Sequence, residues 1–247
     1  MSASSFGHLF KIQSFGESHG GALGVVIDGC PAGLEFDKAL LNAEMERRRP
    51  GTSKLAANTV VSPRNEKDSV EILSGVFEGK TLGTPIAMMV RNSDARSSDY
   101  EELRHQVRAG HADDVWSDKF GHRDHRGGGR SSGRETVARV MAGAVAKMLL
   151  RKLAPELRVL GFASEIGPIA LKDSEKDEFL NSRSHNADNF SARFPSSQHL
   201  EVKSYLENLQ ASGDSCGGVA SIVIDGAPKG LGQPVFHKLK SDLAMAL

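Results

Sequence analysis

The sequence has few of the residues that hold small secreted proteins or metal clusters together. It contains two cysteines, Cys30 and Cys216, which are too few for a disulfide scaffold or a cysteine-ligated metal cluster. The N-terminus lacks the apolar stretch of a secretory signal, and no later run is long enough to cross a bilayer. These absences predict a cytoplasmic protein without a metal and without a membrane partner.

The chain also lacks an excess of positive charge. Lys plus Arg and Asp plus Glu number 31 each, and aromatic residues make up 6%. A nucleic-acid binder needs a basic surface to attract phosphates, and often aromatic rings on which bases stack. We therefore expect no nucleic-acid partner. Any attraction for phosphate must come from local clusters of basic residues.

What the chain does contain is an internal repeat. Residues 16–34 read GESHGGALGVVIDGCPAGL, and residues 213–231 read GDSCGGVASIVIDGAPKGL. Each copy predicts a Gly-rich turn, a buried strand (25–27 and 222–224) and then an Asp-Gly-x-Pro-x-Gly turn. The first-copy residues that recur identically are Gly16, Ser18, Gly20, Gly21, Val26, Ile27, Asp28, Gly29, Pro31, Gly33 and Leu34.

A helical pattern follows each copy. It begins at Phe36 in the first copy and stops at Pro50-Gly51, whereas the second begins at Phe236 and reaches Leu247 without a stop signal. We expect one internally pseudo-duplicated domain that is incomplete at its C-terminus. The domain is predicted over residues 1–247, with repeat units near 16–49 and 213–247.

The segment between the copies mixes strands and helices. Strand-like runs occupy 70–74 and 85–90, with a hairpin turn expected at 79–81. Apolar residues at helical spacing predict a helix over 133–153, with a capping box formed by Ser132 and Glu135. Residues 171–199 are polar and read as a long surface loop. Without strict βαβ alternation, this order predicts an α+β fold.

The first turn contains a histidine that turn geometry does not require. Gly16-Glu17-Ser18-His19-Gly20 matches the G-x-S-x-G string of hydrolases, but a nucleophile elbow has a strand before the serine and a helix after it. Here a strand is expected after the serine, so the hydrolase interpretation fails. The repeat places Cys216 opposite His19. Although a single histidine is more often structural, we interpret His19 as functional.

Two further segments bring together basic residues, histidines and glycines. Residues 121–134, GHRDHRGGGRSSGR, hold four arginines and two histidines around three consecutive glycines, just before the predicted helix. Backbone N–H groups at a helix N-terminus, the hydroxyls of Ser131 and Ser132, and the Arg130 and Arg134 side chains suit a dianion. His111, in Gly-His-Ala-Asp-Asp, is on local sequence alone better read as a structural loop histidine.

A second basic cluster begins at the end of the first predicted helix. Arg47-Arg48-Arg49 complement the helix dipole, but the third arginine and the nearby Lys54 suggest a ligand. Together the clusters and histidines fit the removal of a phosphate leaving group. Arginines stabilise the charge on the departing oxygens, and a histidine supplies a proton near neutral pH.

Several of these segments, in this order, resemble the signature segments of the chorismate synthase family. They are FGESHG (15–20), RRRPGTS (47–53), LSGVFEGKTLGTPI (73–86), RAGHAD (108–113) and RGGGRSSGRET (126–136). The resemblance extends from the first residues to Leu247.

The resemblance implies a lyase of the shikimate pathway of aromatic amino acid biosynthesis, folded as a pseudo-symmetric β-α-β sandwich that assembles as a homotetramer. Members convert 5-enolpyruvylshikimate 3-phosphate to chorismate by 1,4-anti elimination of phosphate, with reduced FMN, for which NADPH is a possible reductant. By position, His19 would protonate the leaving phosphate and His111 would manage the flavin proton. Arg48 and Lys54 would bind substrate or NADP, while Arg130, Ser131 and Ser132 would contact FMN.

The sequence departs from the family pattern at three places. Lys54 stands where the family commonly has Arg, which keeps the charge but loses bidentate geometry. Residues 55–61 carry extra length, and the family continues beyond the equivalent of Leu247, where further FMN contacts and an aspartate are expected. The alternative is a non-catalytic fragment that serves only in assembly or binding.

Overall fold

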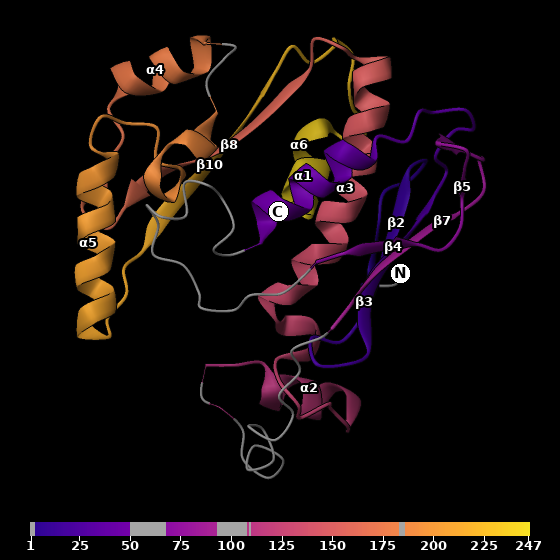
Figure 1. Ribbon diagram of the computed structural model, residues 1–247, viewed down its shortest axis with the longest axis horizontal. Helices are drawn as coiled ribbons and strands as arrows, with labels where there is room; N and C mark the ends of the chain where they lie inside the picture. The colour runs from indigo at the N-terminus through magenta and orange to yellow at the C-terminus, as the bar shows by residue number, and fades with distance from the viewer. Residues whose placement is uncertain (1–2, 50–67, 93–107, 109, 183–185) are drawn as a thin grey trace. The chain divides into compact units, whose positions relative to one another are not determined.

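The computed structural model describes residues 3–49, 68–92, 108, 110–182 and 186–247. They fall into two compact units (Figure 1). The first unit is drawn from residues 1–48, 66–152 and 243–247, and the second from residues 49–65 and 153–242. Each unit has its own sheet and its own hydrophobic cluster.

The first unit is built on a five-stranded antiparallel sheet. Its order is β1-β2-β3-β7-β4, and β3 pairs with β7 so that Val25 lies opposite Met88. Successive side chains on these strands alternate between the two faces. The strands are β1 (Ser5–Phe6), β2 (Lys11–Gly16), β3 (Ala22–Asp28), β4 (Val70–Ile72) and β7 (Ile86–Arg91).

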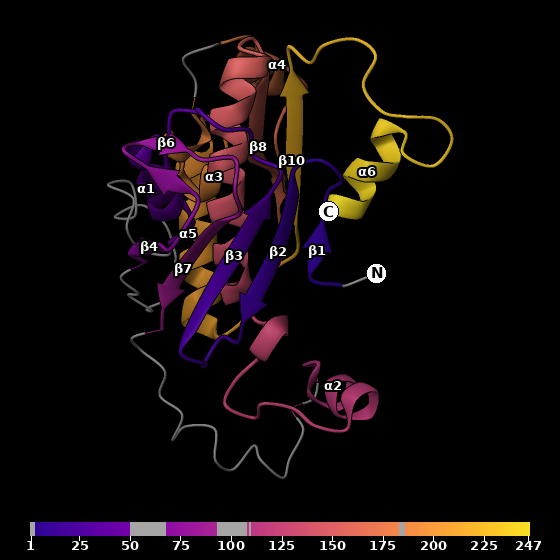
Figure 2. The same ribbon diagram turned by 90° about the vertical axis from the view of Figure 1, so that its right-hand side faces the viewer.

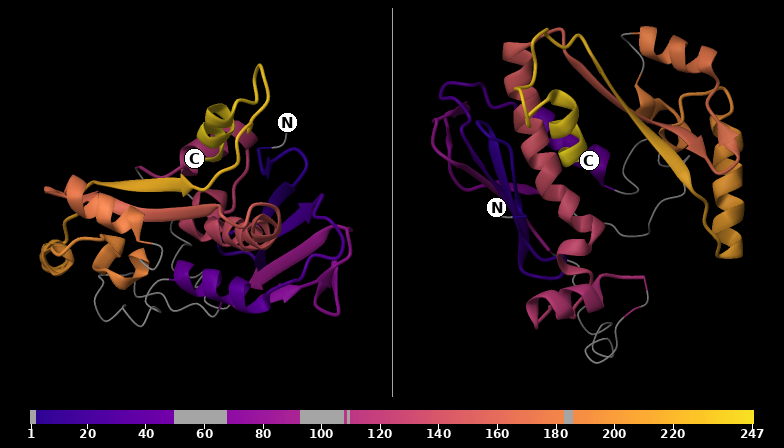
Figure 3. Two further views of the ribbon diagram at one scale, coloured as in Figure 1. Left: turned by 90° about the horizontal axis from the view of Figure 1, so that it is seen from above. Right: turned by 180° about the vertical axis from the view of Figure 1, so that it is seen from behind.

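Two helices, α1 (Lys38–Arg48) and α3 (Thr136–Leu153), bury their apolar residues against one face of this sheet (Figures 2 and 3). Met45 of α1 and Met141 of α3 belong to the same cluster of buried hydrophobic residues as Val25 of β3. This sheet-on-helix layer confirms the predicted α+β class within the first unit. It also fixes the strand ends and the α3 N-terminus that carry the site.

The start of α3 differs from the predicted capping box. The segment begins as a 3-10 turn (Gly133–Glu135), with Ser132 as its N-cap accepting the Arg134 backbone N–H at 3.2 Å. The Glu135 carboxylate does not complete the box, because it pairs with Arg139 at 3.0 Å. The expected hairpin is present between β5 (Val76–Phe77) and β6 (Lys80–Thr81).

The hairpin turn lies one residue earlier than expected. Glu78 and Gly79 form it, with φ angles of 47° and 76°. A two-residue hairpin loop requires left-handed backbone at such positions, and Gly79 adopts it without a steric penalty. Strand β4 is likewise shorter than its prediction and ends at Ile72.

The second unit has a three-stranded antiparallel sheet in the order β10-β8-β9. These strands are β8 (Arg158–Ile166), β9 (Ile169–Ala170) and β10 (Gly218–Asp225). Val223 of β10 packs with Phe162 of β8, whereas Ile222 and Ile224, which point to the opposite face, are 55% and 39% exposed. Because β10 lies at the end of the sheet order, one of its edges is unpaired within this sheet.

The predicted loop over 171–199 is wrong. It contains helix α4 (Asp173–Asn181) and two 3-10 turns, and α5 (His199–Ser212) begins at its end. The physical reason is that one aromatic residue, Phe179, anchors α4 by packing edge-on against Phe162 at a centroid distance of 5.3 Å. A single buried contact per helix leaves almost no periodic signal in the sequence.

The two sequence copies share their strand and the turn after it, but the prediction of a buried strand is wrong for 222–224, where Ile222 and Ile224 are exposed because their face of the sheet is not packed. Gly29 and Gly226 both have positive φ, 79° and 67°, and each donates its N–H to the preceding aspartate, at 2.9 and 2.8 Å. The equivalence does not extend to the first turn, contrary to expectation. Gly16 ends strand β2, whereas Gly213 is the C-cap of α5. Helix α6 (Leu239–Ala246) follows the second copy.

Candidate active site

The turn between β2 and β3 presents His19. The Gly20 N–H donates to the Glu17 carbonyl at 3.0 Å and closes the turn. Ser18, which is buried, places its hydroxyl 3.0 Å from Nδ1 of His19. The hydrogen bond to Ser18 and the closed turn together restrict the orientation of the imidazole.

The Gly-rich segment lies directly against this imidazole. Gly127 has φ 131°, and a Cβ atom built on it would lie 2.2 Å from Nδ1 of His19. Gly129 has φ 53°, and its Cβ would lie 2.8 Å from a carboxylate oxygen of Glu17. Both positions therefore favour glycine, because their positive φ angles strain any other residue. At Gly127 an added Cβ would also overlap the imidazole, whereas at Gly129 it would meet only the flexible end of the Glu17 side chain.

Arg130 fastens the Gly-rich segment to strand β2. Its guanidinium donates to the Gly16 carbonyl at 3.0 Å and to the Ser14 hydroxyl at 2.5 Å, and it lies 3.6 Å from the Glu135 carboxylate. A planar guanidinium with several donors can hold these protein groups and still border a ligand site. The same contacts draw residues 127–130 toward the His19 turn.

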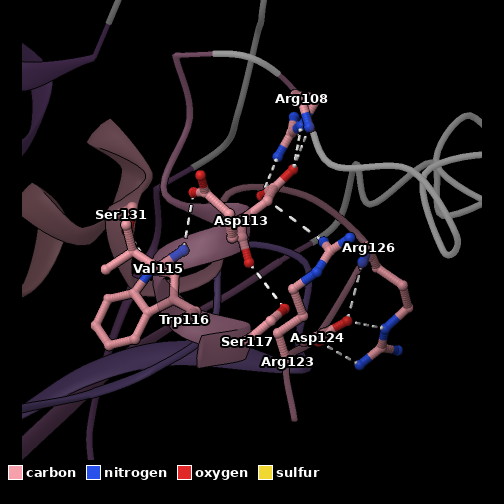
Figure 4. Close-up of polar contacts among 10 residues, drawn as sticks. Arg108, Asp113, Val115, Trp116, Ser117, Arg123, Asp124, Arg126 and Ser131 are labelled. Carbon is pink, nitrogen blue, oxygen red and sulfur yellow. Dashed lines mark hydrogen bonds and ion pairs between the residues drawn. The ribbon is translucent and has the colours of Figure 1, made fainter. Parts of the chain in front are cut away.

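Helix α2 (Asp113–Phe120) forms another wall of the site (Figure 4). The Asp113 carboxylate is buried and receives two hydrogen bonds from the Arg108 side chain, at 2.9 and 3.0 Å. Arg123 lies 3.7 Å away on its other side. These bonds, above all the hydrogen bond from Arg108, hold the pKa of Asp113 below its usual value.

A pocket of about 830 Å³ lies between α2 and the Gly-rich segment. Trp116 and Phe120 of α2 line it and stack with ring centroids 5.4 Å apart. Trp116 also donates its indole N–H to the Ser131 hydroxyl at 2.5 Å. Nε2 of His125 is buried beside the pocket without a hydrogen-bond partner. Such an atom is suited to a polar ligand group.

Carboxylates in this pocket have opposite pKa shifts. Burial raises the pKa of Glu17, an effect that Arg130 opposes and Asp124 reinforces. Hydrogen bonds from Arg126 lower the pKa of Asp124. Two carboxylates in one pocket thus differ in how readily they hold a proton. In the sequence, Glu17 stands out only by its place beside Ser18 and His19.

The structure brings together some of the predicted site residues and not others. Arg130 lines the pocket and His19 abuts Gly127, which also lines it. Ser131 accepts the hydrogen bond from Trp116, and Ser132 caps the 3-10 turn. Neither serine is among the lining residues, and neither is His111, which is exposed.

Of the two remaining predicted positions, Arg48 is not among the residues that line the pocket. The Arg48 side chain is 14% exposed and pairs with Asp68 at 2.8 Å. Lys54 lies outside the described residues. Trp116, Phe120 and His125 are site residues that the sequence analysis missed, because single aromatic residues and histidines in a polar segment have no distinguishing pattern.

The fold and the site together define an α+β protein with a notable pocket. Glycine, arginine and histidine residues line this pocket together with two stacked aromatic rings. A family model of chorismate synthase matches residues 10–247. The chain belongs to the chorismate synthase family.

Curated chorismate synthases from several organisms align with the whole chain. That of Bdellovibrio bacteriovorus is 60% identical over 246 residues, which are 100% of this chain and 71% of that protein. That of Cytophaga hutchinsonii is 47% identical, over 99% of this chain and 65% of its own length. The Methanosarcina mazei protein is also 47% identical, over 100% and 65%. The chain thus spans about two thirds of these relatives.

A solved structure supports the fold. The crystal structure of a chorismate synthase matches with a TM-score of 0.70 and 32% sequence identity, covering 92% of this chain and 61% of the other. Of the helices in the described residues, none has both the length and the apolar character that a membrane span requires.

Proposed function

We propose that the protein converts 5-enolpyruvylshikimate 3-phosphate to chorismate and phosphate by 1,4-anti elimination. The observation that carries this proposal is the family match over residues 10–247, joined to a pocket lined by Gly127, against which His19 lies. We further propose a cytoplasmic homotetramer, as the family resemblance implies.

In this proposal His19 is the general acid for the leaving phosphate. Its imidazole is half-buried, hydrogen-bonded through Nδ1 to Ser18, and fixed against the bare α-carbon of Gly127. A positioned histidine can deliver a proton near neutral pH. Arg48 binds the anionic substrate or NADP, where a guanidinium stabilises charge that develops on phosphate oxygens. Lys54 shares this role.

The residues present fit a flavin phosphate. The Trp116–Phe120 pair offers an aromatic face against which a planar ring system can pack. Arg130, the exposed Ser131 and Ser132 supply groups for the cofactor, and His125 offers its buried ring nitrogen. When bound, reduced FMN would lend an electron to the breaking C–O bond and recover it as the C6 hydrogen leaves, so that no net redox change would occur. NADPH is the proposed source of reducing equivalents, and His111 manages the flavin proton.

The proposal is tested by phosphate release under anaerobic conditions. We expect the protein with reduced FMN to release phosphate from 5-enolpyruvylshikimate 3-phosphate. His19→Ala and His111→Ala should each lower turnover by about two to four orders of magnitude, as loss of a general acid–base group does. Cys216→Ala, at the repeat-equivalent position, should leave turnover nearly unchanged. Release that persists without flavin contradicts the mechanism, and equal losses at His19 and Cys216 contradict the role of the imidazole.

A second candidate follows from the chain's coverage of its relatives. Because the chain spans 65% of the Cytophaga protein, it could serve as a non-catalytic assembly or binding module. Comparing turnover of the 247-residue chain with that of the longer Bdellovibrio bacteriovorus chorismate synthase, of which the chain covers 71%, distinguishes the two. Phosphate release by the 247-residue chain excludes the second candidate.

A further inference from the structure

A buried polar chain runs through the first unit from Arg48 to Asn92. Arg48 donates to one carboxylate oxygen of Asp68 at 2.8 Å, and Arg134 donates to the other at 2.5 Å. Nε of Arg134 then donates to the side-chain oxygen of Asn92 at 3.4 Å, the longest link. The side chains of Asp68 and Arg134 are 3% and 5% exposed.

Asn92 connects this chain to the turn that carries His19. Its side-chain amide donates to the Glu17 carbonyl at 3.1 Å and to the Gly20 carbonyl at 2.9 Å. Its backbone N–H donates to the Gly21 carbonyl at 3.2 Å. One asparagine therefore holds both ends of the turn while its oxygen accepts from Arg134.

The other end of the chain is fixed equally closely. Nε of Arg48 donates to the Thr136 hydroxyl at 3.2 Å, and that hydroxyl donates to the Gly133 carbonyl at 2.7 Å. Arg48 is the last residue of α1, where the dipole favours a cation. Without Asp68, its guanidinium would lose the carboxylate that orients it.

We propose that Asp68 and Asn92 are positioning residues, and that the chain Arg48–Asp68–Arg134–Asn92 mechanically couples Arg48 to the His19 turn. Buried hydrogen bonds in series reinforce one another in a low dielectric. Removing one member leaves its partners buried and unsatisfied, so the disturbance extends along the chain. The kinetic consequence rests on the proposed function, in which Arg48 binds substrate and His19 donates the proton.

Hydrogen exchange tests the coupling without any activity. In Asp68→Asn, amide exchange in the peptide covering residues 15–22 should accelerate about fivefold, as loss of roughly 1 kcal/mol of local protection gives. Among the described residues Asp68 contacts Arg48 and Arg134 and not that turn, so the effect would reach the turn through Arg134 and Asn92. Rates are normalised to the β3–β7 amides, which report global opening.

The matched control is Glu71→Gln. It also removes a carboxylate paired with an arginine, and that arginine, Arg91, is the neighbour of Asn92. The pair is largely exposed, so its loss should change exchange in residues 15–22 by less than about twofold. If Asp68→Asn does not fold, Thr136→Val perturbs the same end more gently and should shift exchange in the same direction. If amide exchange in residues 15–22 is no faster in Asp68→Asn than in Glu71→Gln, the proposed coupling is wrong.

A double-mutant cycle tests the kinetic consequence. Asp68→Asn should raise KM about tenfold by releasing Arg48, and Asn92→Ala should lower kcat about tenfold by releasing the His19 turn. In the double variant the combined loss in kcat/KM should fall short of the product of the single losses. If the loss in kcat/KM of the double variant equals the product of the two single losses, the residues are not coupled. If the wild-type protein shows no turnover, the proposed function is refuted, whereas the hydrogen-exchange result is unaffected.

Discussion

At the scale of single residues, the site depends on the contact between Gly127 and His19. We expect Gly127→Ala to lower turnover about a hundredfold, because a misplacement of about 1 Å in a catalytic group has effects of that size. The added methyl group would lie 2.2 Å from the imidazole, on a backbone with φ 131°. Steady-state phosphate release measures the loss.

Gly133→Ala is the control for this change. Gly133 is in the same segment, its φ is not positive, and nothing lies within 4 Å of the added Cβ. Turnover should stay within about twofold of wild type, as is usual for surface substitutions away from special features. Equal losses in both variants would mean that the segment tolerates no alanine anywhere and that the histidine contact is not the cause.

Glu17 gives a stability prediction with a defined sign. Its folded pKa is raised mainly by burial, so the folded state holds the proton more tightly than the unfolded state does. Stability therefore falls as pH rises above the ordinary glutamate value of 4.5 through the raised folded pKa. Glu17→Gln should raise Tm at pH 7, and the difference should vanish near pH 4.

Asp124→Asn serves as the opposite case in the same pocket. The pKa of Asp124 is lowered, first by hydrogen bonds from Arg126, so its ionised form adds stability above the ordinary value of 3.8. Asp124→Asn should lower Tm at pH 7, with the difference shrinking as pH falls through the lowered folded pKa. Calorimetric scans across this pH range measure both variants, and a decrease of Tm in Glu17→Gln at pH 7 would refute the burial argument.

The sequence singled out His19 as a candidate but not its surroundings. The repeat aligned His19 with Cys216, although the structure does not place the two in equivalent turns, because Gly16 ends β2 and Gly213 caps α5. Glu17 became a site residue only through its contact with the Gly-rich segment, which is distant in sequence. Trp116 and His125 line the pocket within residues 113–130, where the turns of the chain and not a residue pattern bring them together. No local pattern records such contacts.

At the scale of elements, helix α2 carries a reporter of pocket occupancy. Trp116 is the chain's one tryptophan, it lines the pocket, and it is hydrogen-bonded to Ser131. Under the proposed function, FMN should quench its fluorescence in a saturable titration, because a bound flavin would lie near the indole. Ser131→Ala should weaken the binding. Free tryptophan at equal absorbance corrects for inner-filter loss, and quenching no greater than this control contradicts flavin binding in this pocket.

Elements with strong apolar periodicity were predicted well, and weakly anchored ones were not. Helix α3 buries seven residues, including Val137 and Met148, at helical spacing, and its prediction over 133–153 is confirmed apart from the 3-10 turn at its start. Helix α4 buries Phe179 alone and was predicted as a loop. The two predictions differ in outcome because α3 buries several residues and α4 buries one. A helical periodicity can be recognised in the sequence only where several residues of the helix pack against the core.

At the scale of the whole molecule, the order of the motifs predicted more than any element did. Segments from FGESHG to RGGGRSSGRET indicated the family before the structure, and the match over residues 10–247 confirms it. The division into two compact units was not predicted. Composition contains no signal for it, and the repeat suggested one pseudo-duplicated domain. That domain description stays a prediction, as do the tetramer and the missing C-terminal part.

The outward face of β10 determines how the 247-residue chain behaves at high concentration. Ile222 and Ile224 are exposed on a strand with an unpaired edge, and Val159 of β8, opposite Ile224, is 46% exposed. Apolar patches beside a free edge promote edge-to-edge association. Light scattering of the 247-residue chain should therefore rise with concentration, and Ile222→Lys with Ile224→Lys should suppress the rise. The Val223 side chain points into the packed face, so Val223→Lys should instead unfold the second unit. If the double change leaves the scattering unaffected, this face does not mediate association in solution.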